Sequence, residues 1–528
     1  MALTLDALCG GYELKWDKIR SARATPEDKA RLARRHLDAK YGKTLDPIND
    51  ITGVMELSRN RLRVSIEYLI ALAGVMQSYN GQRVIDVALT EEQKAALRRI
   101  PEEFDVDQQA QIELIEKKAE HDLAATTDWL KMQLLSEPRY GLQQYADAVH
   151  FALTSENING PCFGLMHHRL LLEVILPVLI EVQELCLERG ERYLRLPIVA
   201  FTHGQPAEPT TLGKEYLNSA AAIDTALRRF LVRDEQAGEK MPFRFTASMR
   251  GAVGNLNDHY AAYSEINWRG MLDGVVASFG LDPVDMSDQC EPFSRYHAFA
   301  NILDEIGSAI IKCAEDFWLH VHDQVYDKKT KGSHKGSSVM AQKKNPWLVE
   351  GGAAILEKGL EQLHFTIKRM RGYHNQGDMS RSILSRDIGD DYGKIVLGIR
   401  RIIQEMRNYV PNERRIQEHL QANLDIASGA LLALFGSLRV QGEAYRDLQT
   451  GSAEARKGFA EYRAAVAALC DNYNLPEDQK ARALELLKPE SNLGAAVQMG
   501  NKCIKRCRGT IAGLKELYHL ENEPLLRT

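Results

Sequence analysis

Hydrophobic residues recur at the spacing of an α-helix over almost the whole chain. Between Phe299 and Phe317 they fall every three or four positions, and the same holds between Leu212 and Phe230. This spacing gives a helix with one broad apolar face, whereas the alternation typical of strands is not sustained anywhere in the sequence. The sequence therefore predicts an all-α protein. Its longest predicted helices, which are suited to a bundle, lie at 162–195, 209–233, 298–323 and 346–371.

Interruptions of the helical pattern divide the chain into three predicted regions. An N-terminal helical domain (1–138) ends at a proline, and a central long-helix bundle (139–389) precedes a C-terminal helical domain (390–528). The broad apolar faces of the central helices would leave apolar surface exposed after one chain has packed on itself, so we expect a helical oligomer. The charged, amphipathic segment 24–35 predicts a solvated helix near the N-terminus.

Composition and charge are those of an ordinary globular protein. The 528 residues are 44% hydrophobic and 26% charged, and a net charge of −5 argues against nucleic acid as the main partner. The eight cysteines lack the spacing of a disulfide framework, and no apolar run is long enough to cross a membrane. Residues 1–10 lack the pattern of a signal peptide, so we expect a cytoplasmic protein with reduced thiols and no membrane partner. For Cys503 and Cys507, ordinary packing is favoured over a metal site, because a structural zinc needs four ligands.

Residues 336–346 combine a flexible serine segment with a lysine and an asparagine at short, fixed spacing. The segment is Gly-Ser-Ser-Val-Met-Ala-Gln-Lys-Lys-Asn-Pro. Its glycine lets successive backbone N–H groups turn toward an anion, and the adjacent Ser337 can abstract a proton once water is excluded. Lys343 and Asn345 could then hold a carboxylate. The pattern predicts a catalytic lid, although a Gly-Ser-Ser tripeptide alone is more often a linker.

A second candidate is His203, in the segment 202–211, Thr-His-Gly-Gln-Pro-Ala-Glu-Pro-Thr-Thr. Glycine and prolines punctuate a predicted loop that continues directly into a helix, and such a loop can hold an imidazole rigidly. Histidine gives up a proton near neutral pH, so it suits protonation of a nitrogen leaving group. A loop histidine is by itself more often structural, and here the surrounding residues favour the catalytic interpretation.

These two segments resemble the fumarase/aspartase superfamily of lyases. Residues 336–346 are similar to its signature loop, Gly-Ser-Ser-x-Met-Pro-x-Lys-x-Asn-Pro, with Ala341 in place of proline, and 202–211 are similar to a segment of the bacterial adenylosuccinate lyases. The resemblance begins weakly at 37–42, strengthens at 62–69 and covers nearly the whole chain. Three further segments match that family in the same order: 120–122 (Glu-His-Asp), 154–159 (Thr-Ser-Glu-Asn-Ile-Asn) and 251–259 (Gly-Ala-Val-Gly-Asn-Leu-Asn-Asp-His).

The resemblance implies a fold, a reaction and an assembly. The implied fold is all-α with three domains and a central long-helix bundle. That bundle assembles into a homotetramer in which each active site is shared by three subunits. The implied reaction is a β-elimination that splits a carbon–nitrogen bond of an N-succinyl substrate and releases fumarate. The expected partner is a small-molecule substrate, and neither a metal nor an organic cofactor is called for.

Individual residues also receive roles from the resemblance. Ser337 is expected to be the base, His203 the acid, and His121 a residue that supports the acid or holds the leaving group. The implied substrate contacts, several of them to carboxylate or phosphate groups, are Lys40, Tyr41, Asp122, Thr154, Ser155, Gln205, Asn257, Ser338, Met340, Lys343, Asn345, Ser382 and Arg386.

Four further departures from the family pattern bear on the substrate. Lys40 replaces an arginine and lacks its bidentate fork, and Gly377 replaces an arginine that reaches the substrate. Gln342 stands where adenylosuccinate lyases commonly have histidine, as in the argininosuccinate lyase version of the loop. Residues 328–335 are unusually basic, which fits either a solvated loop or a site that attracts a polyanion. A phosphate pocket is therefore expected to be weakened rather than lost.

Three functions remain open on this basis. The default is the cleavage of adenylosuccinate to AMP and fumarate in purine synthesis. The second is a specialised relative that releases fumarate from another aspartate adduct, either similar to argininosuccinate or without a phosphate, in a secondary pathway. The third is a non-catalytic structural protein of crystallin type, which the presence of Ser337 and His203 disfavours.

Overall fold

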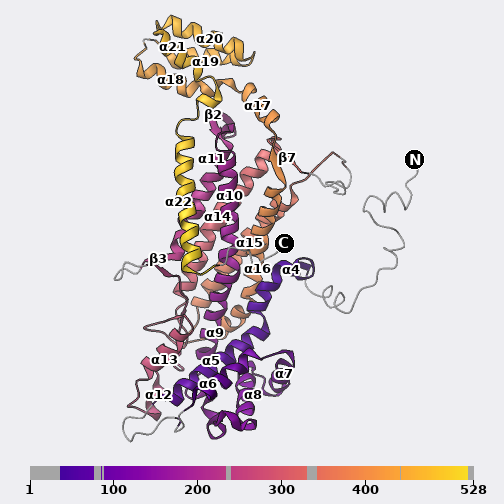
Figure 1. Ribbon diagram of the computed structural model, residues 1–528, viewed down its shortest axis with the longest axis vertical. Coiled ribbons are helices and arrows are strands. Elements are labelled where there is room, and N and C mark those ends of the chain that lie inside the picture. The colour runs from indigo at the N-terminus through magenta and orange to yellow at the C-terminus, as the bar shows by residue number, and fades with distance from the viewer. Residues whose placement is uncertain are drawn as a thin grey trace, which may run out of the picture.

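The computed structural model describes residues 36–75, 85, 89–233, 240–329, 340, 342–440 and 442–520. The body of the molecule is a bundle of long helices that lie side by side along its longest axis (Figure 1). α15 packs along both α14 and α16, and α11 packs against α10 and α14. The bundle helices are α10 (Leu176–Arg192), α11 (Leu212–Leu227), α14 (Ser294–His322), α15 (Trp347–Arg371) and α16 (Ser380–Arg407).

The apolar periodicity of the sequence builds this bundle. In α14, Phe299, Ile302 and Ile306 are buried, whereas Glu305 between them is exposed. Removal of such apolar faces from water is the main favourable contribution to folding. Each long helix predicted from the sequence is present close to its expected range, and the all-α class is confirmed.

The N-terminal helices surround the lower end of the bundle (Figure 1). α9 (Ser155–Leu170) continues into α10 through a π-helical stretch, η3 (Leu171–Ile175), and α5 packs along α9. α4 lies higher and packs along α16. These helices and turns are α4 (His36–Thr52), α5 (Val54–Gly74), α6 (Glu91–Glu102), α7 (Val106–Ala119), α8 (Asp122–Ser136), η1 (Pro138–Tyr140) and η2 (Gln143–His150). α12 (Asn257–Ala262) and α13 (Trp268–Ser278) lie at the same end (Figure 1).

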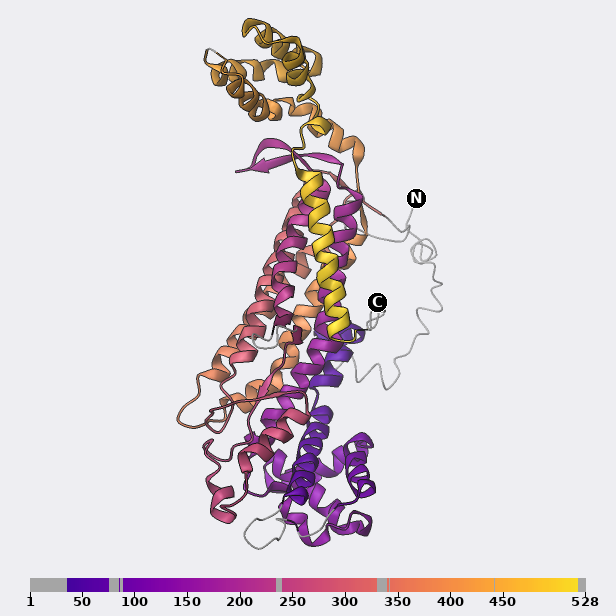
Figure 2. The ribbon, with the colours of Figure 1, turned by 60° about the vertical axis from the view of Figure 1, so that its left-hand side comes forward.

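A small helical cap with its own hydrophobic core stands at the upper end of the bundle (Figure 2). From this cap the chain returns along α10 and α11 as α22 (Ala496–Leu517). α17 (Glu413–Ala422), which packs against β1 (Pro197–Thr202), leads into the cap. The cap is formed by η5 (Leu424–Ala427), α18 (Ser428–Ser437), α19 (Ala444–Ala455), α20 (Phe459–Asn472) and α21 (Glu477–Glu485), and η6 (Pro489–Ser491) follows it. The boundary expected at 389 falls inside α16, and the exact domain limits stay a prediction.

Short strands form two-stranded pairs beside the helices. The most prominent pair is the hairpin of β1 (Pro197–Thr202) and β2 (Gln205–Thr211), so most of the expected loop 202–211 is a strand. The other strands and turns are η4 (Arg228–Phe230), β3 (Leu231–Arg233), β4 (Lys240–Pro242), β5 (Thr246–Ala247), β6 (Asp282–Pro283), β7 (Tyr326–Lys328) and β8 (Tyr409–Pro411).

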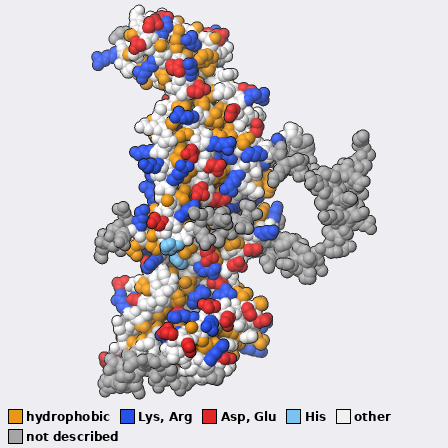
Figure 3. Space-filling model, viewed as in Figure 1, with side chains coloured by type: hydrophobic (Ala, Val, Ile, Leu, Met, Phe, Trp, Pro, Cys, Tyr) orange, Lys and Arg blue, Asp and Glu red, His pale blue; other side chains and the backbone are white. Residues whose placement is uncertain are grey.

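The surface carries basic and acidic side chains interspersed over the visible face, in keeping with the small net charge (Figure 3). A search of the described helices finds none with the length and apolar character that a membrane span requires.

Candidate functional site

His121 caps the first turn of α8, and this cap fixes which ring nitrogen carries the proton. Its Nδ1 accepts a hydrogen bond from the backbone N–H of Ala124 at 3.2 Å, so Nδ1 carries no proton in the neutral ring. The proton then lies on Nε2, which is 3.4 Å from the hydroxyl oxygen of Ser155. Because the imidazole is half exposed, Nε2–H is available as a donor to a group that approaches from solvent.

Asp122 follows His121 and is held between two arginines from distant parts of the chain. Nη2 of Arg61 and Nη2 of Arg386 both donate to its Oδ2, at 2.8 and 2.6 Å. Burial alone would raise the pKa of this carboxyl, but the charges and hydrogen bonds of the two arginines outweigh burial and hold the pKa well below its usual range. Asp122 is therefore an anion that orients Arg386 and not a group that carries a proton.

Arg61 also ties this cluster to the start of α9. Its Nε donates to Oδ1 of Asn159 at 3.0 Å, and both side chains are buried. The start of α9 is closed by a capping box, in which the backbone N–H of Thr154 donates to Oδ1 of Asn157 at 3.0 Å. Ser155 is the first residue of the helix, so the N-terminal N–H groups of α9 lie beside Nε2 of His121. A carboxylate or a phosphate is favoured in such a place.

The first turns of α16 complete the cluster. Nη1 of Arg386 donates to the backbone carbonyl of Ser382 at 2.7 Å and to its hydroxyl, while Nη2 holds Asp122. Asn257 begins α12 with an exposed side chain, in the segment whose Gly251 carbonyl accepts a hydrogen bond from Asn157 at 3.3 Å. The residues predicted from the sequence that the structure brings together here are His121, Asp122, Thr154, Ser155, Ser382 and Arg386.

His203 lies at the tip of the β1–β2 hairpin. His203 and Gly204 have φ angles of 54° and 73°, the left-handed backbone of a type I′ turn, and the pairing of Thr202 with Gln205 closes it. The side chains of His203 and Gln205 are exposed, and the hairpin projects beyond the helices at the upper end of the bundle (Figure 2). The hairpin therefore presents the imidazole away from the bundle of its own chain.

The serine segment of the expected lid, with Ser337 and Ser338, lies outside the described residues. The part that follows it is placed by the structure. The backbone N–H of Lys343 donates to the carbonyl of Met340 at 3.1 Å, and the side chains of both residues are exposed.

Asn345 is anchored where the chain enters α15. Its carbonyl accepts a hydrogen bond from Nζ of Lys328 at 3.0 Å, and the same ammonium group pairs with the carboxylate of Glu405 at 2.7 Å. Lys328 and Glu405 are both buried, so this pair is shielded from solvent screening. Lys328 thus holds the backbone of Asn345, one of the two residues of this segment that are predicted to bind a carboxylate.

Lys40 and Tyr41 lie in α4, beside the C-terminal half of α16. The Tyr41 backbone departs from helical geometry, and its ring lies 5.3 Å from the guanidinium of Arg401. Arg401 also lies over the ring of Trp347, the first residue of α15, at 5.1 Å. These aromatic–guanidinium contacts place Lys40 and Tyr41 near the residues that follow the lid and not near Arg386.

Within one chain, the predicted site residues therefore fall into separate groups. Arg386 and Arg401 mark two of them on the same helix, separated by about 22 Å at a rise of about 1.5 Å per residue. The His203 hairpin lies still further along the bundle (Figure 2). A single chain does not bring His121 and His203 into one cleft.

Sequence reasoning missed Arg61, Asn159 and Arg401. Arg61 precedes the matched segment 62–69 by one position, and its partner Asp122 lies 61 residues further along the chain. Nothing in the local spacing indicates such a pairing; the position of Arg61 directly before a matched segment was the one signal in the sequence.

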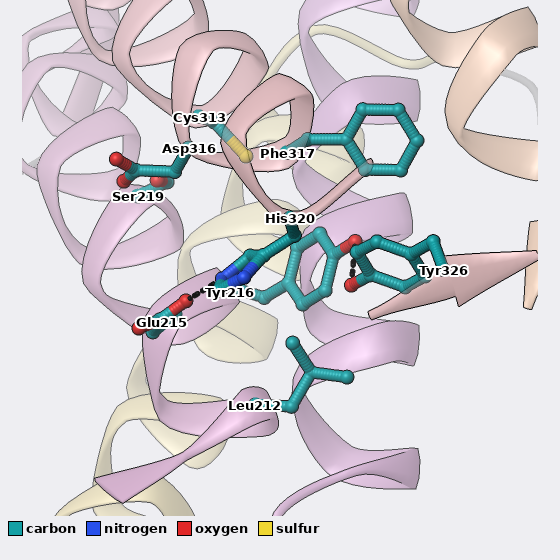
Figure 4. A pocket seen from close by; sticks show the side chains of 9 residues that line it. All are labelled: Leu212, Glu215, Tyr216, Ser219, Cys313, Asp316, Phe317, His320 and Tyr326. Atoms are coloured by element: carbon teal, nitrogen blue, oxygen red, sulfur yellow. Dashed lines mark hydrogen bonds and ion pairs between the residues drawn. The ribbon is translucent and has the colours of Figure 1, made fainter. Parts of the chain in front are cut away.

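A small cavity at the base of the hairpin is lined by none of the predicted site residues (Figure 4). Burial would lower the pKa of His320, but its hydrogen bond and ion pair with Glu215 outweigh this and raise the pKa. The hydroxyls of Tyr216 and Tyr326 lie 2.7 Å apart. The remaining space, about 10 Å³, is about that of one water molecule, so the cavity joins α11 to α14 and β7 and does not hold a substrate.

No cluster of three or more potential metal ligands is present among the described residues. The sulfurs of Cys503 and Cys507 lie 3.7 Å apart on α22, and both cysteines are free.

A family model described as a lyase matches residues 40–358, which is more than half of the chain. The chain belongs to the fumarase/aspartase superfamily of lyases. This confirms the resemblance found in the sequence. The expected enzyme class, a carbon–nitrogen lyase that releases fumarate, is confirmed at the level of this family.

Curated members of the superfamily match this chain over nearly its full length. Adenylosuccinate lyase from Buchnera aphidicola subsp. Acyrthosiphon pisum is 24% identical over 467 residues, which are 88% of this chain and 97% of the relative. Adenylosuccinate lyase from Escherichia coli K12 is 25% identical over 88% of this chain and 96% of its own length. Adenylosuccinate lyase from Dictyostelium discoideum is 25% identical over 87% of this chain and 95% of its own length.

Solved structures of superfamily members support the same fold. A fumarate lyase from Mesorhizobium sp. BNC1 superposes with a TM-score of 0.62 at 14% identity, covering 87% of this chain and 97% of that structure. A 3-carboxy-cis,cis-muconate lactonizing enzyme from Pseudomonas putida superposes with a TM-score of 0.64 at 17% identity, covering 90% of this chain and 100% of that structure. At these identities the likeness shows the fold alone.

Proposed function

We propose that the protein releases fumarate by β-elimination from an N-succinyl adduct, with adenylosuccinate as the default substrate and AMP as the second product. The curated relatives named adenylosuccinate lyase support this substrate. The observation that carries the proposal is the cluster in which His121, Ser155 and the Asp122–Arg386 pair surround the N-terminus of α9. It offers a proton donor and oxyanion contacts within a few ångströms of one another.

The chemistry requires removal of a proton next to a carboxylate and protonation of the departing nitrogen. Ser337 is the proposed base, and His203 is the proposed acid. Nε2–H of His121 would hold the leaving group beside Ser155. Lys343 and Asn345 would bind the succinyl carboxylate, where negative charge accumulates in the transition state, and loss of one such donor typically costs about 3 kcal/mol.

A homotetramer with shared active sites is part of the proposal. Support comes from the separation of the predicted residues within one chain, since a partner that brings a hairpin to the His121 cluster would complete the site. The purified protein should therefore have about four times the 59.4 kDa mass of one chain. Active monomers would contradict the shared site. The seven described cysteines are all free, which suits the cytoplasmic location that we propose.

A specialised relative is the second candidate, and Gly377 is the observation that favours it. The resemblance implies an arginine at this position that reaches the substrate, and glycine supplies no side chain. Lys40 and Ala341 also depart from the family pattern, and both changes favour the specialised relative as well. An enzyme of this kind would release fumarate from a different aspartate adduct, either similar to argininosuccinate or without a phosphate group.

The deciding experiment follows the absorbance of fumarate after addition of adenylosuccinate, argininosuccinate or a succinyl adduct without phosphate. Release from adenylosuccinate alone supports the default substrate. Release only from another adduct supports the specialised relative. Activity with none of them contradicts the proposal and favours a non-catalytic protein, and a Ser337→Ala variant distinguishes true turnover from a contaminating lyase.

A further inference from the structure

A buried arginine without hydrogen-bond partners lies beside the candidate site. Arg381, in the first turn of α16, is 1% exposed. Its Nε, Nη1 and Nη2 atoms all lack a hydrogen-bond partner among the described residues. An arginine keeps its charge at any physiological pH, and a buried charge that is neither paired nor hydrogen-bonded is strongly unfavourable. The position is therefore costly for the fold unless a further group binds the guanidinium.

Among the described residues, the guanidinium packs against an aromatic ring. Its central carbon lies 4.3 Å from the centre of the Tyr373 ring, and the hydroxyl of Tyr373 donates to Asp288 at 2.8 Å. A cation over an aromatic face gains less free energy than is lost by burying the charge. The ring fixes the plane of the guanidinium but leaves its N–H groups unsatisfied.

Two acidic side chains of this region, Glu156 and Glu291, make their hydrogen bonds to other groups. Glu156 accepts hydrogen bonds from Asn159 and from Cys290. Burial raises the pKa of Glu291 to about 8, so this carboxyl is protonated near neutral pH; its Oε2 accepts from Thr246. Among the described residues, no carboxylate forms a hydrogen bond with the guanidinium, which is enclosed between α16 and the segment that leads to Cys290.

Gly377 lies directly against this charge. A Cβ atom at position 377 would stand 3.1 Å from Nη2 of Arg381 and 2.9 Å from Oε1 of Gln289. Gly377 is half-buried and Gln376 is exposed, so a thin stretch of chain separates the guanidinium from solvent. The absence of a side chain at 377 allows Arg381 and Gln289 to approach the backbone this closely.

The start of α9 lies on the other side of the same segment. The backbone carbonyl of Gln289 accepts a hydrogen bond from Asn157, which closes the α9 cap, and Glu156 follows Ser155. The unpaired guanidinium and the positive end of a 16-residue helix are thus neighbours. Both attract an anion.

We propose that Arg381 binds an oxyanion of the substrate, a carboxylate or a phosphate, and so takes over the contact that Gly377 cannot make; this assignment rests on the proposed function. The fork geometry of arginine allows two parallel hydrogen bonds to such a group. The substrate thereby supplies the counter-charge that the folded chain lacks.

The test compares Arg381→Met with Arg371→Met in the full-length protein. Arg371 is exposed, and its charge acts on the same carboxyl, Glu291, so its removal controls for the loss of nearby positive charge. Binding of inorganic phosphate and of fumarate is measured by calorimetry, and KM and kcat are measured with whichever adduct releases fumarate. We expect Arg381→Met to weaken anion binding and raise KM by roughly tenfold to a hundredfold, with a smaller change in kcat. Arg371→Met should change both by less than about threefold.

Thermal stability separates binding from a structural role. Without ligand, Arg381→Met should be as stable as the parent or more stable, because an unpaired buried charge is removed. Arg381→Lys should recover part of the affinity, since it keeps the charge and loses the fork. Stabilisation by phosphate or by fumarate alone identifies which oxyanion binds.

Two outcomes would overturn the assignment: unchanged KM and anion affinity in Arg381→Met, or a protein to which neither anion binds. If KM is unchanged while fumarate is still released, the assignment fails and the proposed function stands. If no adduct releases fumarate but phosphate binding still requires Arg381, the oxyanion site stands and the proposed function fails.

Discussion

At the scale of single residues, the site is organised by charges that the protein fixes in place. Arg61 and Arg386 reach one carboxylate, Asp122, from helices far apart in the sequence. The carboxylate keeps the two guanidinium groups close together, and it directs Arg386 toward the start of α9. Removing the carboxylate would leave one buried and one half-buried cation without their shared partner.

We therefore expect Asp122→Asn to lower the free energy of unfolding by about 2 kcal/mol at neutral pH. Because the folded-state pKa of Asp122 is held below its unfolded value, its contribution is present above about pH 4 and is lost as the pH falls further. Urea unfolding at several pH values checks both points. The control is Asp285→Asn, whose ion pair with Arg269 is exposed and screened by solvent, so this variant should lose much less stability. Equal losses in the two variants would contradict the prediction.

The contribution of Glu291 to the free energy of unfolding should depend on pH in the opposite direction to that of Asp122. Its folded-state pKa of about 8 lies above the ordinary value, because burial disfavours the carboxylate. The folded protein then holds a proton that the unfolded chain has released, so stability is full below about pH 4.5 and falls as the pH rises toward 8, by about 1.4 kcal/mol per pH unit.

Glu291→Gln cannot ionise and should lack this loss of stability. Unfolding midpoints in urea between about pH 5 and about pH 8 should decline for the parent and stay nearly level for the variant. The exposed Glu92→Gln serves as the control and should follow the parent. Parallel curves for the parent and Glu291→Gln would show that Glu291 is ionised in the folded state.

The sequence predicted the residues of the site better than their partners. His121, Ser155, Ser382 and Arg386 were named as site residues because each lies in a short segment that resembles the family; the structure brings them together, and their roles stay predictions. Arg61 and Arg381 were not found, since their importance depends on contacts across the fold or on the absence of contacts. A buried guanidinium without a hydrogen bond leaves no pattern in the sequence.

At the scale of elements, periodicity gave the long helices and missed the hairpin. A helix such as α14 repeats its apolar pattern over many turns, and the repetition makes the signal strong. β1 and β2 are short, β2 contains two prolines, and the register shifts between Ala200 and Phe201. The alternation of a strand is therefore not visible there. What determines the hairpin is the left-handed backbone at His203 and Gly204.

Gly204→Ala tests whether this turn geometry positions the imidazole. An alanine in the left-handed region costs about 1 kcal/mol of backbone strain, and nothing within 4 Å would clash with its Cβ. We expect only a small fall in the melting temperature. We expect kcat to fall by about tenfold, because the turn holds the His203 side chain in position.

Gly280→Ala is the matched control for Gly204→Ala. Gly280 has the same φ angle of 73° and no neighbour within 4 Å of a built Cβ, but it follows α13, away from the hairpin. It should show the same loss of stability with unchanged kcat. If both variants retain full activity, the turn does not position the acid.

At the scale of the whole molecule, the distribution of the predicted residues determines how a site can form. His121 and Arg386 occupy one cluster, and His203 projects from the other end of the same bundle (Figure 2). A long bundle that packs against copies of itself can bring the hairpin of one chain to the cluster of another. Symmetric assembly would then produce equivalent shared sites.

Mixing two inactive variants tests this arrangement. His121→Ala damages the cluster and His203→Ala damages the hairpin, so each alone should lose activity by about a hundredfold or more. After the subunits are dissociated and reassembled together, a site that draws its two histidines from different chains is intact in about a quarter of random combinations. We expect kcat per mixed protein to recover to about that fraction of the parent value.

The control mixture is His121→Ala with Arg386→Ala. Nη2 of Arg386 is bonded to Asp122, next to His121, so both residues belong to one chain's cluster and no exchange of subunits can restore an intact one. This mixture should stay inactive, while native mass spectrometry shows that mixed oligomers have formed. Recovery in the control, or mixed oligomers of His121→Ala and His203→Ala without activity, would mean that the two histidines do not serve one site from different chains.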